Sequence, residues 1–189
     1  MIGRRLQFFS VALLLASVAA AHSDELRPGN IYRLTFQDVD GNTHSTSNGH
    51  VTIITVTTRQ TEKRAREVAE LMPDRCLGDP KFRYLTFVNF QRKLGRAFQG
   101  MTKAIIRRRL DAEGKRLKAK YEAKKIARDA RKDIFVVPDF DGAAVTQLGL
   151  SPDSGQAAVF VFNGEGRLVN RWTGVPPGDS LAKAITAAE

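Results

Sequence analysis

Cysteine is almost absent from this chain. Its 189 residues include one cysteine, Cys76, in a loop-forming segment between Pro73 and Pro80. A single thiol excludes a disulfide within the chain and an internal thiol–disulfide couple, so the fold has to be stabilised by burial of apolar side chains. We expect Cys76 to be a partly buried, inert thiol, and the alternative is a reactive one.

Long apolar segments are also lacking. No run of 18 or more apolar residues is present, so no membrane-spanning helix is expected in the mature chain. The N-terminus instead combines Arg4 and Arg5, a short apolar segment, and three alanines at 19–21, which is typical of a secretory signal peptide. We expect residues 1–21 to be that signal peptide and residues 22–189 to form a periplasmic or secreted protein. A short membrane anchor is the alternative, and Sec and twin-arginine export both stay open.

Motifs for cofactors and metals are missing as well. The sequence has no glycine-rich phosphate-binding motif, no second cysteine and no H-E-x-x-H, and its histidines are His22, His44 and His50. A metal site needs three or four converging ligands, so we expect no bound metal and no cofactor. Asp139 and Asp141 are loop carboxylates for which turn and helix capping is favoured over acid–base catalysis.

Positive charge, by contrast, is abundant and concentrated. The chain carries 30 Lys/Arg against 20 Asp/Glu, a formal charge of +10. Thirteen of the basic and five of the acidic residues lie within residues 103–133. A helix with this charge density attracts anionic partners. Pairs such as Asp111–Lys115 and Glu113–Arg116 offer the alternative of a solvated helix stabilised by its own ion pairs.

Hydrophobic patterning predicts alternating strands and helices. The first half of the chain is predicted to form a β-hairpin over 28–46 with a turn at 38–42, a buried strand over 51–57, a helix to about 71 capped by Thr58 or Thr61, and a strand over 82–90. A helical region over 92–132 follows. The last part is predicted to form a strand over 134–137, a short helix over 142–150, strands over 157–162 and 167–172, and a helix to 188. Gly95, Gly100 and Gly114 interrupt the long helical region, which we expect to consist of two or more pieces. This order predicts a single α/β domain with a mixed central sheet and helices on both faces.

Two segments resemble the thioredoxin-fold superfamily. Residues 38–42, followed by Gly49-His50-Val51, resemble the superfamily's D-x-D-G-x … G-K-V approach to its central strand. Residues 159–169, followed by Gly174, resemble its closing hairpin, F-x-x-D-x-x-G-x-x-V … G. The resemblance spans nearly the whole mature chain and implies a thioredoxin-like three-layer fold with an N-terminal β-hairpin. A long basic helix, at about 101–132, is an insertion relative to that fold.

The chain departs from the superfamily where redox chemistry takes place. Active members have a W-C-x-x-C segment at the start of the first helix, and Arg59, Gln60 and Lys63 occupy that place here. The cis-proline before the closing hairpin has no match, since Pro152 lies too early. Cys76 follows the helix, so helix N-terminal amides cannot stabilise its thiolate as in a peroxiredoxin. The resemblance therefore implies a member that has lost its redox cysteines.

Three further segments resemble the YtfJ-type family, periplasmic thioredoxin-fold proteins without the cysteine pair. They are residues 58–61 with Lys63, residues 83–86 with Val88-Asn89, and residues 158–169. This resemblance implies an exported non-catalytic binding or accessory protein. The alternative function is a thiol-dependent enzyme of altered chemistry that uses the lone Cys76.

The candidate binding residues form two groups. They are Arg59, Gln60 and Lys63 at the former redox position, and Arg107, Arg108 and Arg109 on the basic helix. The first group would line a partner groove, with an ordinary capped helix start as the alternative. The second would bind an unidentified protein or an anionic surface, such as lipid headgroups or lipopolysaccharide. Nucleic acid is not the expected partner, because Tyr121 is the one aromatic residue available within residues 103–133 for base stacking.

The basic helix has only a narrow apolar stripe. The stripe consists of Ile106, Leu110, Leu117 and Tyr121. Because it is too narrow to hold the whole helix on the sheet, we expect the first part of the helix to dock and the later part to project. Gly114 is the expected weak point between the two parts.

Overall fold

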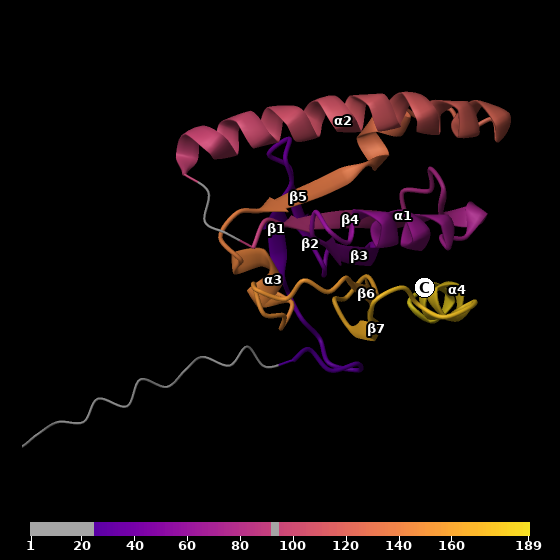
Figure 1. The fold of residues 1–189 in the computed structure, drawn as a ribbon. Helices are drawn as coiled ribbons and strands as arrows, with labels where there is room; N and C mark the ends of the chain where they lie inside the picture. Colours follow the sequence, from indigo (N-terminus) through magenta and orange to yellow (C-terminus); the bar gives the residue numbers. More distant parts are fainter. Residues whose placement is uncertain (1–24, 92–94) are drawn as a thin grey trace, which may run out of the picture.

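A five-stranded mixed sheet forms the centre of the protein. The computed structural model describes residues 25–91 and 95–189, so the predicted signal peptide lies outside the described residues. The strands are β3 (Val51–Thr57), β4 (Phe82–Asn89), β5 (Phe135–Asp139), β6 (Ala158–Phe162) and β7 (Leu168–Thr173). Their order in the sheet is β5-β4-β3-β6-β7 (Figure 1). Strands β3, β4 and β5 are parallel to one another, and β6 runs antiparallel to both of its neighbours, β3 and β7. The predicted mixed α/β sheet is confirmed.

The central strand is β3, as its β-branched sequence predicted. All seven of its residues are buried. Ile54 lies opposite Leu85 of the parallel strand β4 and opposite Phe160 of the antiparallel strand β6. A strand with partners on both edges and cover on both faces has no exposed side, which is why its seven residues are Val, Ile and Thr, all β-branched and none charged.

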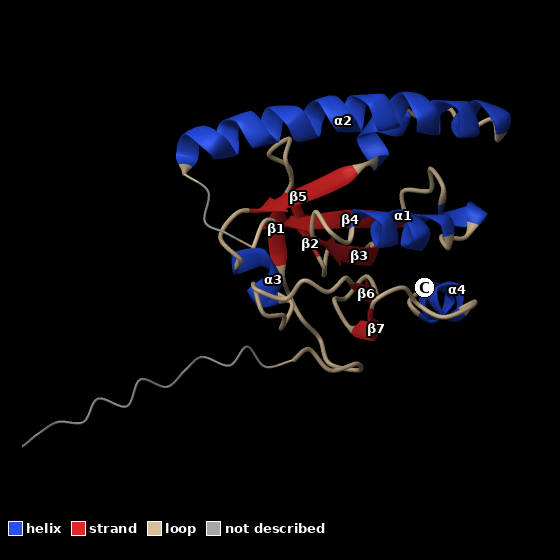
Figure 2. Ribbon diagram, in the orientation of Figure 1, coloured by secondary structure: helices blue, strands red, loops and turns tan. Residues whose placement is uncertain are grey.

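Helices cover both faces of the sheet (Figure 2). Helices α1 (Glu62–Glu70) and α4 (Ser180–Ala187) cover one face, where Val68, Leu181 and Ile185 pack against β3 and β6. Helix α3 (Ala143–Gln147) covers the other face together with the N-terminal hairpin. The predicted three-layer arrangement is therefore confirmed.

The N-terminal hairpin is shorter than predicted. Its strands are β1 (Thr35–Gln37) and β2 (Thr43–Ser45), whereas the sequence predicted a hairpin over 28–46. The preceding segment pairs elsewhere, because the Tyr32 amide donates to the carbonyl of Gly166, 2.8 Å away. The predicted turn is present, with Gly41 at a φ of +91°. Its Val39 amide donates to the Val136 carbonyl on β5, at 2.8 Å, so the turn covers part of that edge of the sheet.

The long helical region forms one α-helix and a short 3₁₀ helix, and the glycines inside the α-helix do not interrupt it. Helix α2 (Arg96–Ala123) starts after Gly95 and passes through Gly100 and Gly114 without a break. It ends nine residues before the predicted end, and a 3₁₀ helix, η2 (Ala130–Asp133), follows. Gly114 is a point of close approach and not a weak point, since an added Cβ would lie 3.0 Å from the Cβ of Arg131.

A Schellman motif ends α2 at a position that carries no glycine. Lys125 has a left-handed φ of 56°. The Lys125 amide donates to the Glu122 carbonyl at 3.1 Å, and the Ile126 amide donates to the Tyr121 carbonyl at 2.9 Å. Because lysine seldom takes the left-handed conformation, no helix stop could be predicted at this residue.

The first part of α2 was predicted to dock and the later part to project, but the later part is the more deeply buried one. Leu110 is 7% exposed and packs with Val39 and Val136, and Tyr121 is 2% exposed. The first turns instead leave Phe98 61% and Met101 57% exposed. Helix α2 runs along the β5 edge of the molecule, with the hairpin turn against it near Arg107 and η2 against it near Gly114 (Figure 1).

Candidate functional site

The junction between β3 and α1 carries the first group of predicted binding residues. Arg59, Gln60 and Lys63 are all exposed there. Thr61 precedes the helix, and its hydroxyl accepts from the Thr58 amide at 2.9 Å without capping α1 through its side chain. The junction is therefore held by a threonine turn and presents the three predicted residues to solvent.

The three arginines at 107–109 have three different environments. Arg107 donates to the carbonyl of Val39, and its Nε lies 3.3 Å from a carboxylate oxygen of Asp40. Arg109 lies 3.9 Å from Glu62 at the start of α1, which brings the two predicted groups of residues next to each other. In the described part of the chain, no carboxylate lies within ion-pair distance of Arg108. Arg108 is thus available to a partner, whereas Arg107 holds the hairpin turn.

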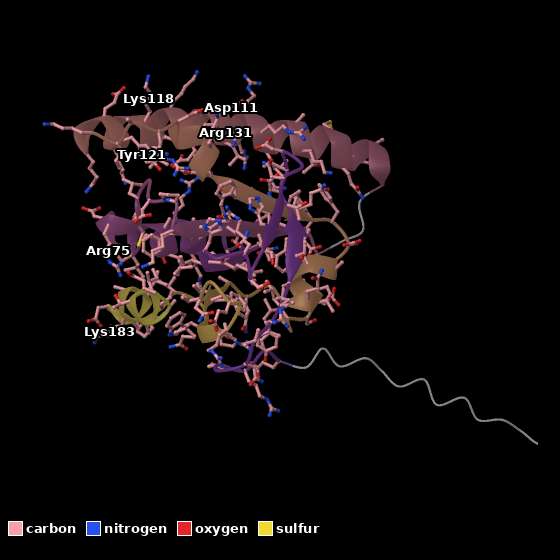
Figure 3. All side chains as sticks on the ribbon, turned by 180° about the vertical axis from the view of Figure 1, so that it is seen from behind. Arg75, Asp111, Lys118, Tyr121, Arg131 and Lys183 are labelled. Atoms are coloured by element: carbon pink, nitrogen blue, oxygen red, sulfur yellow. The ribbon has the colours of Figure 1, made fainter. Side chains whose placement is uncertain are left out.

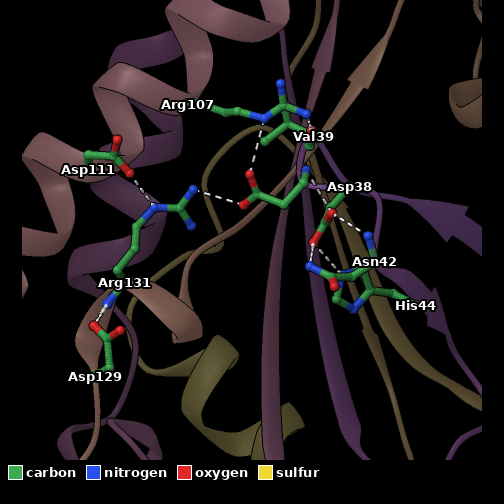
Figure 4. Close-up of polar contacts among 9 residues, drawn as sticks. Asp38, Val39, Asn42, His44, Arg107, Asp111, Asp129 and Arg131 are labelled. Carbon is green, nitrogen blue, oxygen red and sulfur yellow. Dashed lines mark hydrogen bonds and ion pairs between the residues drawn. The ribbon is translucent and has the colours of Figure 1, made fainter.

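A network of charged side chains fixes the later part of α2 (Figure 4). Arg131 on η2 lies 2.8 Å from Asp40 of the hairpin turn and 2.9 Å from Asp111 of α2. Burial lowers the pKa of Arg131, but hydrogen bonds to the two carboxylates outweigh it and raise the pKa overall. Sequence analysis missed this network and paired Asp111 with Lys115, because Asp40 and Arg131 are 91 residues apart in the chain. The predicted Glu113–Arg116 pair is present at 3.3 Å.

Beneath this network lies a buried Asp–His pair. The Oδ2 of Asp38 is 2.8 Å from the Nε2 of His44, and their side chains are 2% and 4% exposed. Burial raises the pKa of Asp38, but hydrogen bonds from His44 and Asn42 outweigh this and leave the pKa below its ordinary value. The ring of His44 packs 4.6 Å from that of Phe135. The pair therefore supports the turn on which α2 rests.

The remaining histidine and carboxylates have structural roles. The Nδ1 of His50 lies 2.8 Å from the carbonyl of Pro80. Asp139 accepts from the amides of Gly142 and Val145, both at 2.9 Å, and Asp141 accepts from the Ala143 amide at 3.0 Å. The predicted capping role of the two aspartates is thus confirmed. Within residues 25–91 and 95–189, His, Cys, Asp and Glu side chains form no group of three or more that could hold a metal ion.

Cys76 lies inside the core on the α1 side of the sheet. It ends the 3₁₀ helix η1 (Asp74–Cys76), is 8% exposed, and belongs to the apolar cluster that contains Val68 and Ile185. Burial raises the pKa of its thiol to about 11, and nearby Arg75 opposes this only in part. At pH 8 only about one molecule in a thousand carries the thiolate, which is the nucleophilic form.

The fold is the one that the sequence resemblance implied. Solved structures similar to this chain include the exposed lipoprotein thioredoxin Etrx1 from Streptococcus pneumoniae, with 15% identity, a TM-score of 0.51, and coverage of 82% of this chain and 99% of that one. They also include BsSco, of the Sco family of cytochrome c oxidase assembly proteins, with 13% identity, a TM-score of 0.51, and coverage of 87% and 95%. A peroxiredoxin-like protein from Aquifex aeolicus has 15% identity, a TM-score of 0.50, and coverage of 87% and 89%. This chain has a thioredoxin-like fold.

Comparison of the sequence with family models and with curated proteins identifies no family within this fold. No family model matches the chain, and no curated protein matches it. The resemblance to the YtfJ-type family therefore stays a prediction. In the described residues of this thioredoxin-like chain, no helix has both the length and the apolar composition required to cross a membrane.

Proposed function

We propose that this thioredoxin-like chain is an exported binding or accessory protein without redox activity. The observation that carries the proposal is the position of its thiol. By the sequence resemblance, the two cysteine positions of the superfamily fall near Gln60 and Lys63, and Cys76 is buried in the core beyond the C-terminal end of α1 with its pKa raised to about 11. A thiol in that state is a poor nucleophile and has no second thiol to resolve a mixed disulfide.

Insulin-reduction and peroxide-consumption assays on the mature chain test the redox proposal. We expect neither activity, and we expect the wild type and Cys76→Ala to behave alike. Activity that vanishes in Cys76→Ala would support the alternative function, a thiol-dependent enzyme that uses Cys76. Labelling with a thiol reagent provides a second measurement, in which the native protein should react much more slowly than the urea-unfolded one.

Export is the second part of the proposal. It is supported by the sequence of the first 21 residues, with Arg4 and Arg5 before an apolar segment and Ala19-Ala20-Ala21 at its end. Expressed with its own leader, the protein should be recovered from the periplasm or medium as a chain that begins at His22. Mass spectrometry that finds residues 1–21 intact on a cytoplasmic protein would contradict export.

The third part concerns what the protein binds. Exposed basic residues support an anionic partner surface; they are Arg108 and Lys115 on α2 and Lys125 just after its end. No carboxylate among the described residues lies within ion-pair distance of these three. Their summed field attracts anions and is screened by salt. The protein should bind heparin at low salt and elute as salt is raised.

Variants can separate this surface from the hairpin contact. Arg108→Gln with Lys115→Gln should weaken heparin retention without loss of stability. An Arg59→Ala, Lys63→Ala double variant tests the junction between β3 and α1. Heparin retention equal to that of the wild type would show that Arg59 and Lys63 are not part of the binding surface. Absence of heparin retention by the wild type at low salt would leave α2 as a solvated helix held by its own ion pairs.

A further inference from the structure

The outer face of α2 carries large apolar side chains. Phe98, Met101 and Ile105 are spaced by three and four residues, so they project from one side of the helix within about 60° of each other. They are 61%, 57% and 50% exposed. Of the four large hydrophobic side chains that are exposed in the described part of the chain, these three share one helix face.

This apolar stripe continues along the helix and is bordered by cations. At 100° per residue, the exposed residues Ala112, Ala119 and Ala123 extend the same face toward the end of α2. Basic residues lie on both sides of it; they are Arg108 and Lys115 on one side and Arg109 and Lys120 on the other, while Arg116 lies in line with Phe98 on the stripe itself. We call this arrangement of Phe98, Met101 and Ile105 with its flanking cations the outer face.

The outer face points away from the protein. The buried side of α2 carries Leu110 and Tyr121, more than a quarter turn from the stripe. Tyr121 and Arg131 lie between α2 and the sheet (Figure 3). The helix forms one margin of the molecule along its length of 28 residues, or about 42 Å, so a flat surface can meet the whole outer face at once (Figure 1).

Charge complementarity selects the partner of this face. A lone exposed hydrophobic side chain is ordinary, but three on adjacent turns form a contiguous patch. Cations flank the stripe on both sides, so the surface it meets has to be anionic over a width greater than one helix. An apolar stripe between two rows of Lys and Arg is the pattern of a helix that lies in the interface of an anionic bilayer.

We propose that the outer face of α2 docks flat on an anionic lipid bilayer. Phe98, Met101 and Ile105 enter the boundary between headgroups and acyl chains, and the flanking Arg and Lys side chains contact the lipid phosphates. This inference rests on the proposed anion-binding function and adds to it the kind of surface and an apolar anchor. Because the anchor is insensitive to screening, bilayer binding resists salt better than heparin binding does.

Co-sedimentation with vesicles tests the inference. The wild type should bind phosphatidylglycerol–phosphatidylcholine vesicles and not phosphatidylcholine alone. The variant Phe98→Ser, Met101→Ser, Ile105→Ser should lose roughly tenfold or more in vesicle partitioning while its heparin retention is unchanged. Ile31→Ser is the matched control, because Ile31 is 42% exposed and lies away from α2.

The outcomes separate this inference from the proposed function. Heparin retention without vesicle binding, or a triple serine variant that binds vesicles like the wild type, would overturn the bilayer inference alone. Absence of binding to both heparin and anionic vesicles would overturn the anion-binding function as well. Circular dichroism and thermal unfolding should show that the serine variant is folded, since the replaced side chains are exposed.

A fluorescent label can report the orientation directly. In a Cys76→Ala background, Met101→Cys places a single thiol on the outer face, and Lys118→Cys places one on the side of α2. An environment-sensitive dye at position 101 should shift to the blue on addition of anionic vesicles, and the same dye at 118 should shift much less. Equal shifts at the two positions would contradict a flat docking through the outer face.

Discussion

The two halves of α2 belong to one helix but have different surroundings. The later half, from Leu110 onward, is fixed by burial of Tyr121, by the close approach of Gly114 to Arg131, and by the Asp40–Arg131–Asp111 network. The earlier half exposes Phe98 and other large apolar side chains. The later half is therefore part of the folded core, whereas the earlier half has a surface that costs free energy in water and is suited to a partner.

This difference follows from what lies beneath the helix. From Ile106 onward the helix covers the β5 edge, where the Val39 turn and η2 supply apolar and charged contacts. Unpaired backbone groups at the edge of a sheet invite aggregation, and cover by a helix removes that hazard. The later half of the helix therefore contributes most to stability, whereas the earlier half carries the large apolar side chains of the proposed docking face.

The largest expected difference in stability is between variants of two aromatic residues, Tyr121 in the later half of α2 and Phe98 in the earlier half. Tyr121→Ala should lower the free energy of unfolding by about 3–5 kcal/mol, because it empties a site that is 2% exposed. Phe98→Ala should change it by less than about 0.5 kcal/mol, because that ring is mostly in solvent. Urea unfolding of the two variants measures the difference, and similar losses would mean that both halves are packed.

A second pair uses the two glycines inside the helix. Gly114→Val should destabilise the protein by about 1–3 kcal/mol, since even a Cβ there would lie 3.2 Å from the Cα of Arg131. Gly100→Val should be neutral or stabilise slightly, because nothing lies within 4 Å of the added Cβ and valine is the better helix former. Thermal unfolding distinguishes them, and a stable Gly114→Val would refute the close contact with η2.

Acid should weaken the buried Asp38–His44 pair, which supports the hairpin turn beneath α2. The pKa of Asp38 lies below its ordinary value of 3.8, so the ionised form stabilises the folded state above that value, and the contribution is lost as pH falls through the folded pKa. Denaturant unfolding below about pH 4 should therefore show a steeper loss of stability for the wild type than for Asp38→Asn. Parallel pH curves would show that Asp38 does not carry this dependence.

The smallest expected difference in stability is between two carboxylates that form ion pairs, Asp40 of the hairpin turn and Glu113 on α2. Asp40→Asn should cost about 0.5–1 kcal/mol, because Asp40 bridges Arg107 and the half-buried Arg131. Glu113→Gln should cost at most a few tenths of a kcal/mol, since Glu113 and its partner Arg116 are 55% and 76% exposed. Urea midpoints measured at low and high salt provide the test, and equal effects would contradict a role for Asp40 in fixing the helix.

Strands and short helices could be predicted from the sequence because their signals are local. The β-branched run at 51–57 predicted the buried centre of the sheet, and Asp139 predicted the start of α3. The end of α2 could not be predicted, because Lys125 adopts a conformation that its side chain does not favour. The hairpin was predicted too long because residues near Tyr32 pair with the Gly166 turn, which is distant in sequence.

The candidate site was predicted in part. The exposed positions of Arg59, Gln60 and Lys63 follow from their place after a buried strand. The separate roles of Arg107 and Arg108 do not follow from the sequence, because each depends on whether a carboxylate from another segment lies nearby. Phe98 and Met101 of the outer face precede the basic segment 103–133, and the sequence pattern predicted docking through the first part of α2, whereas the later part is the more deeply buried.

The sequence by itself determined the alternation of strands and helices, the absence of a redox couple and the concentration of positive charge. These properties depend on residue identity and on spacing along the chain. Tertiary structure alone decided which half of α2 is buried, that Gly114 is a contact point, and that Asp40 holds Arg131. Each of these depends on segments far apart in sequence coming together at the β5 edge, where packing and desolvation outweigh local preference.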